Sequence, residues 1–378
     1  MRIGIDARLL EREMTGIGRF LIGFLDSVPK LDTENEYFLF SFGNLENYKK
    51  RGFKIIQTRR NKLIPSKIYS PIWLNFILPH YIGKNNIDLF FFPSAITPQV
   101  NLKCKTIILL CDVFHKVNEK YHPFLYRKYL DLFLNSSIKK SDLILTISQN
   151  SKKDIINFYN VPEEKIKVIY LAADGKFRPR LLSINQRNSL IRKYNLPQKF
   201  ILYVGIIDFR KNIDAIIEVA DILVNRKKKD IYFILVPGLG GRDEPFIKKS
   251  QKIKKGHIIF LNNVERKDIP IMYNLADIFF FPSLYEGFGL SPLEAMQSGL
   301  PVITSNTSSL PEVVGKAGIM REPNDYEGFS SDIIKLLEDK KFYNKVKKQG
   351  LKQAKKFSWQ KTTEEIVKLF NRIYEGEK

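Results

Sequence analysis

The sequence predicts an α/β protein built from two doubly wound domains, each a parallel sheet with helices on both faces. Short apolar runs typical of buried strands alternate with stretches typical of helices, and this alternation occurs twice along the 378 residues. A chain of this length exceeds one ordinary hydrophobic core. Residues 177–180 begin a polar, proline-containing connection that is typical of a linker. We therefore predict domains at 1–180 and 181–357, followed by a final helix at 358–378.

The first domain should contain seven strands, because seven short runs are apolar and rich in β-branched or aromatic residues. They are expected at 2–6, 37–42, 53–57, 88–93, 106–110, 142–148 and 167–170. A glycine loop and an amphipathic helix ending near residue 28 follow the first strand, and Ser148 is placed to cap the helix after the sixth. The stretch 61–81 mixes cations with aromatic and aliphatic residues. It is either a helix that covers the sheet or a segment that rests on a membrane surface.

The second domain repeats the pattern. Strands are expected at 200–204, 231–237, 257–261, 279–281 and 301–304, and helices from 214, at 271–276, from 292, at 335–357 and at 358–374. The strand at 279–281 runs into a loop with glycines at 287 and 289, and then Ser291 and Pro292 form an N-cap and a first helical residue. A strand, a glycine loop and a helix N-terminus together present backbone N–H groups to an anion.

Two carboxylates frame this predicted anion site. Glu286 precedes the loop and Glu294 lies in the first helical turn. In isolation, Glu294 complements a helix dipole and Glu286 solvates a loop. A sugar nucleotide, however, needs a diphosphate site bordered by acceptors for hydroxyl groups, which gives both carboxylates a role. A second site of the same kind follows Gly205, where Arg210 and Lys211 precede a helix.

The string EGFGLSPLEAMQSGLPVITSNTSSLPEVVG at 286–315 resembles the E-x7-E signature of the retaining glycosyltransferases of family 4. The resemblance implies the GT-B architecture: two Rossmann-like domains facing across a cleft, with the C-terminal helix crossing back to the first. It also implies metal-independent transfer from a nucleotide-diphosphate sugar, with retention of anomeric configuration. Glu286 would lie near the donor sugar and Glu294 on the ribose hydroxyls. The loop that binds the diphosphate would comprise Gly287, Phe288, Gly289 and Leu290.

The string YVGIIDFRKN at 203–212 resembles the donor-phosphate segment of the same family. That resemblance makes Lys211 the cation that neutralises the leaving group and Gly205 part of the donor site. Many relatives carry an arginine directly after this glycine. Position 206 is Ile here, so we expect Arg210 to serve instead.

The opening MRIGIDARLLEREMTGIGRF is similar to the first strand and glycine loop of these enzymes, which places Gly16 and Gly18 near the sugar and the acceptor. Val264 is the expected contact to the nucleobase. Relatives commonly have His-Asp where this chain has Cys111 and Asp112, so Asp112 is kept as a catalytic candidate. His115 either contributes to the sugar site or is an ordinary solvated loop residue.

Lysine and arginine exceed the acidic residues, giving a formal net charge of +22. The excess reflects binding to anionic lipid head groups, binding to nucleic acid or a lysine-rich coding bias. No recognition motif supports nucleic acid as a partner. No apolar run reaches the roughly 18 to 20 residues of a membrane span, and no signal peptide is recognised. Cys104 and Cys111, if on one strand, lie roughly 20 Å apart at about 3.3 Å per residue. We expect no disulfide and a reducing cytoplasmic setting, with or without peripheral contact to the inner face of the membrane. The sequence does not predict the oligomeric state.

Neither an Asp-x-Asp motif nor a histidine cluster is present, so we expect no metal and no cofactor other than the donor substrate. The opening resembles bacterial mannosyltransferases of polysaccharide or lipid-linked glycan assembly. GDP-mannose is thus the expected donor, with UDP-linked sugars as the alternative. A saccharide or lipid-linked glycan in cell-surface polysaccharide or lipopolysaccharide synthesis is the expected acceptor. The rival functions are a sugar-nucleotide epimerase on the same scaffold and a sugar-nucleotide-binding protein that has lost catalysis, which Cys111 favours.

Overall fold

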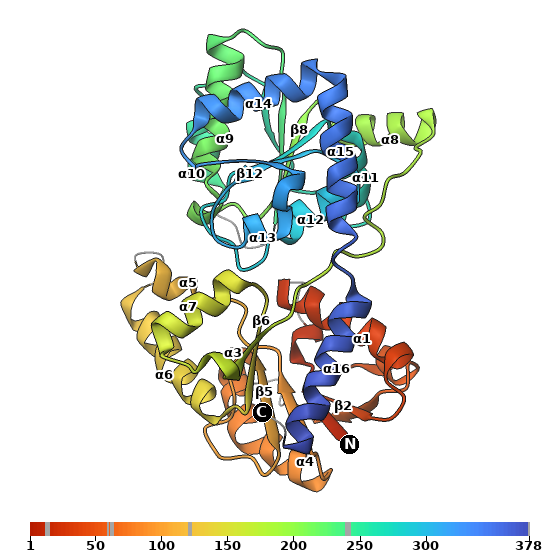
Figure 1. Ribbon diagram of the computed structural model, residues 1–378, viewed down its shortest axis with the longest axis vertical. Helices are drawn as coiled ribbons and strands as arrows, with labels where there is room; N and C mark the ends of the chain where they lie inside the picture. Colours follow the sequence, from red (N-terminus) through yellow and green to blue (C-terminus); the bar gives the residue numbers. More distant parts are fainter. Residues whose placement is uncertain (12–15, 59, 61–63, 120–122, 239–242, 377–378) are drawn as a thin grey trace. The chain divides into compact units, whose positions relative to one another are not determined.

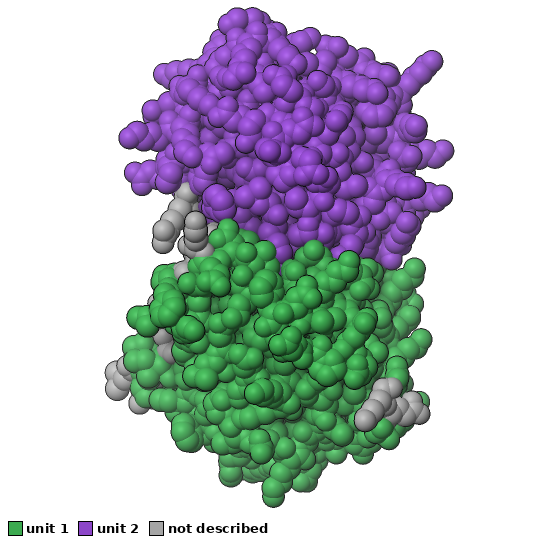
Figure 2. Space-filling view, turned by 60° about the vertical axis from the view of Figure 1, so that its left-hand side comes forward, with its two compact units in different colours: residues 1–171, 358–378 green, residues 172–357 purple. Residues whose placement is uncertain are grey.

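The computed structural model describes residues 1–11, 16–58, 60, 64–119, 123–238 and 243–376. These divide into two compact units, shown in different colours in Figure 2: unit 1 comprises 1–171 with 358–378, and unit 2 comprises 172–357. Unit 1 therefore ends before the predicted boundary at residue 180. The reason is that unit 2 binds the expected linker: Gln297 donates to the carbonyl oxygen of Phe177 (2.7 Å), and Asn274 to that of Arg178 (3.1 Å).

Unit 1 contains a sheet of seven parallel strands in the order β3-β2-β1-β4-β5-β6-β7 (Figure 1). The strands are β1 (Arg2–Asp6), β2 (Glu36–Ser41), β3 (Lys54–Gln57), β4 (Leu89–Phe92), β5 (Lys105–Leu109), β6 (Leu143–Thr146) and β7 (Ile166–Val168). Most are runs of apolar residues without polar alternation, because helices cover both faces of the sheet. The register is parallel throughout, with Ile5 of β1 opposite Phe91 of β4.

The helices of unit 1 come from both ends of the chain. They are η1 (Arg8–Glu11), α1 (Gly16–Leu31), α2 (Glu46–Lys49), α3 (Ser66–Ile72), the π-helical η2 (Trp73–Ile77), α4 (Leu78–Lys84), α5 (Phe114–Val117), α6 (Phe124–Lys140), α7 (Gln149–Tyr159), η4 (Glu163–Lys165) and α16 (Trp359–Glu375). The expected N-cap at Ser148 is confirmed, since its side chain accepts from the N–H of Ser151.

Successive phenylalanines of β4 point to opposite faces of the sheet. Phe90 and Phe92 join a core cluster with residues of α3, η2, α4, α6 and α7. Phe91 lies on the other face, where its ring contacts Phe24 of α1 and Phe370 of α16. Figure 1 shows α1 and α16 side by side. Helix α16, at the C-terminal end of the chain, therefore supplies part of the core of unit 1.

Unit 2 has six parallel strands in the order β10-β9-β8-β11-β12-β13. They are β8 (Ile201–Gly205), β9 (Phe233–Pro237), β10 (Ile258–Phe260), β11 (Ile278–Phe281), β12 (Val302–Ser305) and β13 (Ile319–Arg321). This is the strand order of the dinucleotide-binding Rossmann fold. Two parallel sheets, each wound with helices, confirm the predicted α/β class.

The helices of unit 2 connect these strands. They are α8 (Ile184–Tyr194), η5 (Phe209–Lys211), α9 (Ile213–Ala220), the π-helical η6 (Asp221–Arg226), α10 (Glu244–Ser250), α11 (Ile269–Leu275), α12 (Leu290–Gln297), α13 (Leu310–Val314), η7 (Gly315–Ala317), α14 (Tyr326–Glu338) and α15 (Lys340–Ala354). Among all helices of the described residues, none combines the length and apolar composition needed to span a bilayer.

Three predicted helix boundaries are wrong. Gly16 and Gly18 lie in the first turn of α1 and not in a loop, while Thr15 of the same motif lies outside the described residues. Helix α12 begins at Leu290 because Gly289, at φ +111°, turns the chain into the helix, so Ser291 is not its N-cap. The expected helix at 335–357 is interrupted because Asp339 adopts an extended backbone and caps α15.

Candidate active site

The site lies in unit 2, where the strand order reverses between β8 and β11. β8 is followed in space by β9 on one side, and β11 by β12 on the other, so the loops that leave β8 and β11 diverge. A doubly wound sheet binds ligands at the carboxyl ends of its strands at this point. The two loops are joined by a hydrogen bond from the N–H of Leu284 to the carbonyl oxygen of Arg210 (2.8 Å). The segments predicted to bind the donor phosphates therefore meet at the switch point.

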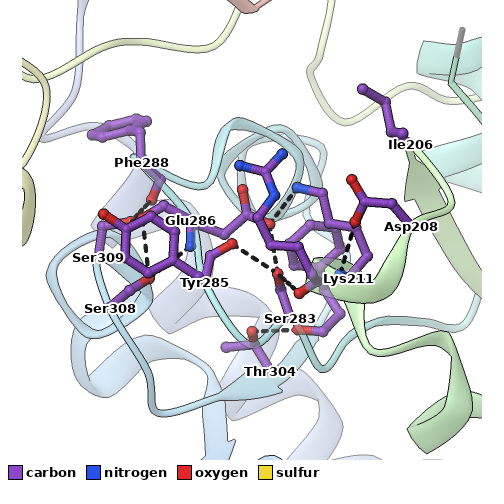
Figure 3. Close-up of polar contacts among 12 residues, drawn as sticks. Ile206, Asp208, Lys211, Ser283, Tyr285, Glu286, Phe288, Thr304, Ser308 and Ser309 are labelled. Atoms are coloured by element: carbon purple, nitrogen blue, oxygen red, sulfur yellow. Dashed lines mark hydrogen bonds and ion pairs between the residues drawn. The ribbon is translucent and has the colours of Figure 1, made fainter. Parts of the chain in front are cut away.

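Lys211 is held in place by its backbone and its side chain. It ends the short η5, where Asp208 caps the turn by accepting from the N–H of Lys211 (3.1 Å). The side chain is buried, and its Nζ lies 2.5 Å from Glu286 Oε1 and 5.3 Å from the centroid of the Phe281 ring. Figure 3 shows Lys211 and Glu286 directed toward each other from the two loops.

The opposite charges of Lys211 and Glu286 stabilise the ionised forms of both buried side chains. Burial favours the neutral carboxyl of Glu286, but the charges of Lys211 and Arg210 outweigh it and hold the pKa of Glu286 below its usual range. Burial lowers the pKa of Lys211, and the Glu286 carboxylate counteracts this effect. The site thus contains a carboxylate and an ammonium group that keep each other ionised in a dry environment. Such perturbed, paired groups at a sheet switch point are typical of functional sites.

Hydroxyl groups hold the loop that carries Glu286. Ser283 Oγ lies 2.7 Å from Glu286 Oε1. The N–H of Glu286 donates to Ser308 Oγ (2.7 Å), and Ser309 Oγ lies 2.9 Å from the carbonyl oxygen of Glu286 and 2.7 Å from that of Phe288 (Figure 3). Ser305 Oγ donates to the carbonyl oxygen of Ser283. The sequence prediction missed these serines, although Ser305, Ser308 and Ser309 belong to a hydroxyl-rich run that starts at the end of β12.

Two helices begin at this edge of the sheet, after the two loops. Helix α9 follows Asn212, whose backbone is left-handed (φ 53°) and whose side chain donates to the carbonyl oxygen of Pro323 (3.0 Å). Helix α12 follows Gly289. Within the described residues, no side chain caps the first turn of either helix. The backbone N–H groups of both first turns are therefore placed to bind an anion.

Glu294 is buried in the first turns of α12, on the side facing α11. The hydroxyl of Tyr273 donates to Glu294 Oε2 (3.2 Å), and the Tyr273 ring packs edge-on against Phe177 (5.5 Å between centroids). Tyr273 is itself buried. It therefore fixes the direction of the Glu294 carboxylate, a positioning role that the sequence did not reveal.

We expect Tyr273→Phe to weaken donor binding by a fewfold, because a net hydrogen bond to a charged group contributes about 1.5–3 kcal/mol and part of it remains replaceable by water. The ring packing stays, so the unfolding free energy should change little. The measurement is KM for the donor beside kcat. An unchanged KM with a lower kcat would contradict the positioning role on the donor side.

Other predicted donor residues lie around this centre. Gly205 ends β8, and a side chain there would place Cβ 3.0 Å from the Tyr203 hydroxyl. Val264 is half-buried in the loop after β10, next to Glu265, whose N–H donates to the Tyr194 hydroxyl (3.1 Å). Gly287, Phe288, Gly289 and Leu290 form the loop and the start of α12 beyond Glu286.

The remaining candidates belong to unit 1. Gly16 and Gly18 start α1. Asp112 follows β5, and its Oδ1 accepts from the N–H of Phe114 (3.1 Å). Burial raises the pKa of the Cys111 thiol, so this group is a neutral, weak hydrogen-bonding partner.

His115 is not a solvated loop residue. It is buried, and its Nε2 lies 3.2 Å from Asp131 Oδ1 and 3.0 Å from the Tyr159 hydroxyl. Burial lowers its pKa despite the nearby Asp131. The ring thus belongs to an internal network that fastens α6 and α7 to α5.

Comparison with known proteins agrees with this geometry. A family model described as "Glycosyltransferase Family 4" matches residues 15–175, and one described as "Glycosyl transferases group 1" matches residues 186–353. The O-antigen chain mannosyltransferase B of Escherichia coli is 29% identical over 98% of this chain and 99% of that protein. The serotype-specific mannosyltransferase WbdA of Escherichia coli is 30% identical over 74% of this chain, which matches 35% of its length.

The fold has counterparts among solved structures. The crystal structure of Anabaena Alr3699/HepE in complex with UDP-glucose matches with a TM-score of 0.72 at 16% identity, over 98% of this chain and 99% of that one. The two family matches fall one on each doubly wound unit, and the resemblance at 286–315 lies within the second match. The chain belongs to the family 4 glycosyltransferases, enzymes of the GT-B fold.

Proposed function

We propose that this chain transfers mannose from GDP-mannose to a saccharide or lipid-linked glycan acceptor, with retention of anomeric configuration and without a metal ion. The acceptor is a growing chain of cell-surface polysaccharide or lipopolysaccharide, built in the cytoplasm at the inner face of the membrane. Two relatives named mannosyltransferases, one of them matched over nearly its whole length, support mannose as the sugar.

The observation that carries the proposal is the buried Lys211 at the switch point of unit 2. When the bond between the sugar and the β-phosphate breaks, negative charge develops on the departing diphosphate. A preorganised cation in a dry site stabilises that charge far more than it would in water. Lys211 supplies the ammonium group, Arg210 adds a second cation whose charge acts on the same pair, and the first turns of α9 and α12 add N–H donors.

Glu286 has two roles in this proposal. In the protein alone it pairs with Lys211 and keeps the lysine charged. With the donor bound, the β-phosphate competes for the ammonium group, and the carboxylate accepts from hydroxyl groups of the donor sugar. Glu294, fixed by Tyr273, accepts from the ribose hydroxyls. Val264 lies in the loop that contacts the nucleobase.

Charge neutralisation by these protein groups supports a metal-independent reaction. Lys211, Arg210 and two helix N-termini take the part that a divalent cation takes in other phosphate-transfer sites. Gly16, Gly18 and Asp112 of unit 1 are assigned to the sugar and the acceptor, and the neutral Cys111 leaves the contact to the sugar to Asp112.

The decisive experiment is a thermal-shift and transfer assay with GDP-mannose, GDP-glucose, UDP-glucose and UDP-galactose. A donor at about a hundred times its dissociation constant stabilises the protein by about 2.7 kcal/mol. We expect this shift for GDP-mannose, and an α-linked product by NMR when an acceptor is added. Stabilisation by UDP sugars alone would overturn the donor assignment, and a β-linked product would overturn retention. Loss of transfer on adding a chelator would overturn metal independence.

A further inference from the structure

One side of unit 1 exposes large apolar side chains in a regular pattern. On α6, Leu125, Tyr129 and Leu132 recur at helical spacing and are 80%, 50% and 69% exposed. Residues spaced by three and four positions share one face of a helix. On this helix, the buried residues Leu134 and Ile138 lie on the opposite face, in the core cluster. Helix α6 is therefore apolar on its inner face and again on its outer face.

A second stripe of the same kind lies on α3 and η2. Ile68, Ile72 and Phe76 recur every four residues and are 57%, 40% and 74% exposed. Their helical neighbours Tyr69 and Trp73 point into the core cluster. The described residues within 64–81 thus cover the sheet with one side and present apolar groups with the other.

The chain between β4 and β5 joins these two stripes. The N–H of Gln99 donates to Asn75 Oδ1 of η2 (2.7 Å), and the N–H of Thr97 donates to Ser137 Oγ of α6 (2.9 Å). Val100, in the same connection, is 44% exposed. Seven residues make up what we call the outward apolar face: Ile68, Ile72, Phe76, Val100, Leu125, Tyr129 and Leu132. Exposed apolar groups in such number and order mark an interaction surface.

Cations outnumber acids on the segments that carry the outward apolar face. Residues 64–84 contain no Asp or Glu. Helix α6 has one acid, Asp131, which is turned to His115 and Lys116 (2.6 Å), and four cations. A nearby acid, Glu119, pairs with Arg127 of α6. Apolar groups bordered by lysine and arginine complement a bilayer with anionic head groups.

We infer that the outward apolar face docks unit 1 on an anionic phospholipid bilayer, with the leucines, isoleucines and Phe76 in the acyl boundary and Lys128 and Lys139 at the head groups. A second copy of this chain fits less well, because a shared interface would bring cations against cations. The tyrosine of the stripe suits the same depth, since its ring is apolar and its hydroxyl is polar. This inference does not depend on which sugar is transferred.

The test is co-sedimentation of the full chain with phosphatidylcholine vesicles that contain or lack phosphatidylglycerol. We expect strong binding to the anionic vesicles and weak binding to phosphatidylcholine alone. Two double variants remove apolar groups from this face: Leu125→Ser with Leu132→Ser, and Ile72→Ser with Phe76→Ser. Each should weaken binding roughly tenfold or more, because each CH₂ group that is no longer buried in the acyl region lowers the affinity for the bilayer. The matched control is Leu181→Ser with Ile184→Ser in unit 2, which removes equally exposed apolar groups and should leave binding unchanged.

All replaced side chains are exposed, so the thermal midpoint should stay the same and transfer to a water-soluble acceptor should be retained. Equal binding by the wild type and both α6 and α3 variants would overturn the inference, as would failure of the wild type to bind anionic vesicles. Sedimentation velocity tests the remaining alternative, in which a second copy of this chain covers the face. A wild-type dimer that Leu125→Ser with Leu132→Ser converts to a monomer would assign the face to a second copy and overturn the lipid assignment.

Discussion

Lys211→Met should lower kcat roughly a hundred- to a thousandfold, the usual loss when one preorganised donor to a developing negative charge is removed. Methionine keeps an apolar stem against the Phe281 ring, 5.3 Å from the present Nζ, so the packing changes little. Donor dissociation should change much less than turnover, because the charge on the diphosphate grows as the bond breaks. Single-turnover rates and donor titrations measure the two quantities separately.

The variant has a structural side effect that needs a control. Removing the ammonium group leaves the buried Glu286 carboxylate without its partner, and breaking a buried ion pair from one side costs about 3–5 kcal/mol of unfolding free energy. The double variant Lys211→Met with Glu286→Gln removes both charges and should recover most of that loss. Its turnover should stay low. Recovery of turnover together with stability would show that Lys211 acts only as a structural partner of Glu286.

The sequence led to both halves of this pair but not to the pair itself. The sequence predicts a strand, a glycine loop and a helix start around Gly205 and around Gly287, because buried parallel strands are continuous apolar runs. Lys211 and Glu286 were assigned to different parts of the donor. Their contact joins positions 75 residues apart and follows from the reversal of strand order between β8 and β11, which the local pattern does not contain.

The supports around the pair were harder to foresee. Ser308 and Ser309 act through backbone groups of a loop on another strand, so nothing in their own neighbourhood assigns them a role. Tyr273 reaches Glu294 from a different helix. Gly289 starts α12 by its left-handed backbone, whereas the sequence offered the stronger N-cap residue Ser291. In each case a tertiary contact or a special backbone angle determines the outcome.

Helix α6 shows a different limit. Its outward stripe of apolar residues fills the positions where an ordinary surface helix has polar ones, so the sequence lacks the one-sided period that predicts a helix. The feature that hides the helix from sequence reasoning is the same one that marks its outer face as an interaction surface. The predicted linker at 177–180 lies in unit 2, where the carbonyl oxygens of Phe177 and Arg178 accept from Gln297 and Asn274.

Phe370→Ala in α16 should lower the unfolding free energy of unit 1 by about 3–5 kcal/mol, as expected for truncation of a fully buried phenylalanine. Phe370 is 0% exposed, and its ring centroid lies 6.2 Å from that of Phe24 and 5.6 Å from that of Phe91. The chain has two tryptophans, Trp73 and Trp359, and both belong to unit 1. Urea unfolding followed by tryptophan fluorescence therefore reports on unit 1 selectively.

The control is Tyr374→Ala in the same helix, where the side chain is 50% exposed and a change within about 0.5 kcal/mol is expected. An unchanged fluorescence midpoint for Phe370→Ala would mean that α16 only tethers the chain. The expected loss of stability would mean that α16 is part of the hydrophobic core of unit 1. Gly23 of α1 lies so close to Trp359 that a Cβ there would be 2.3 Å from its ring, so α1 has no room for a side chain where α16 packs. Unit 1 then completes its core only when the last helix is present, after all of unit 2 has been synthesised.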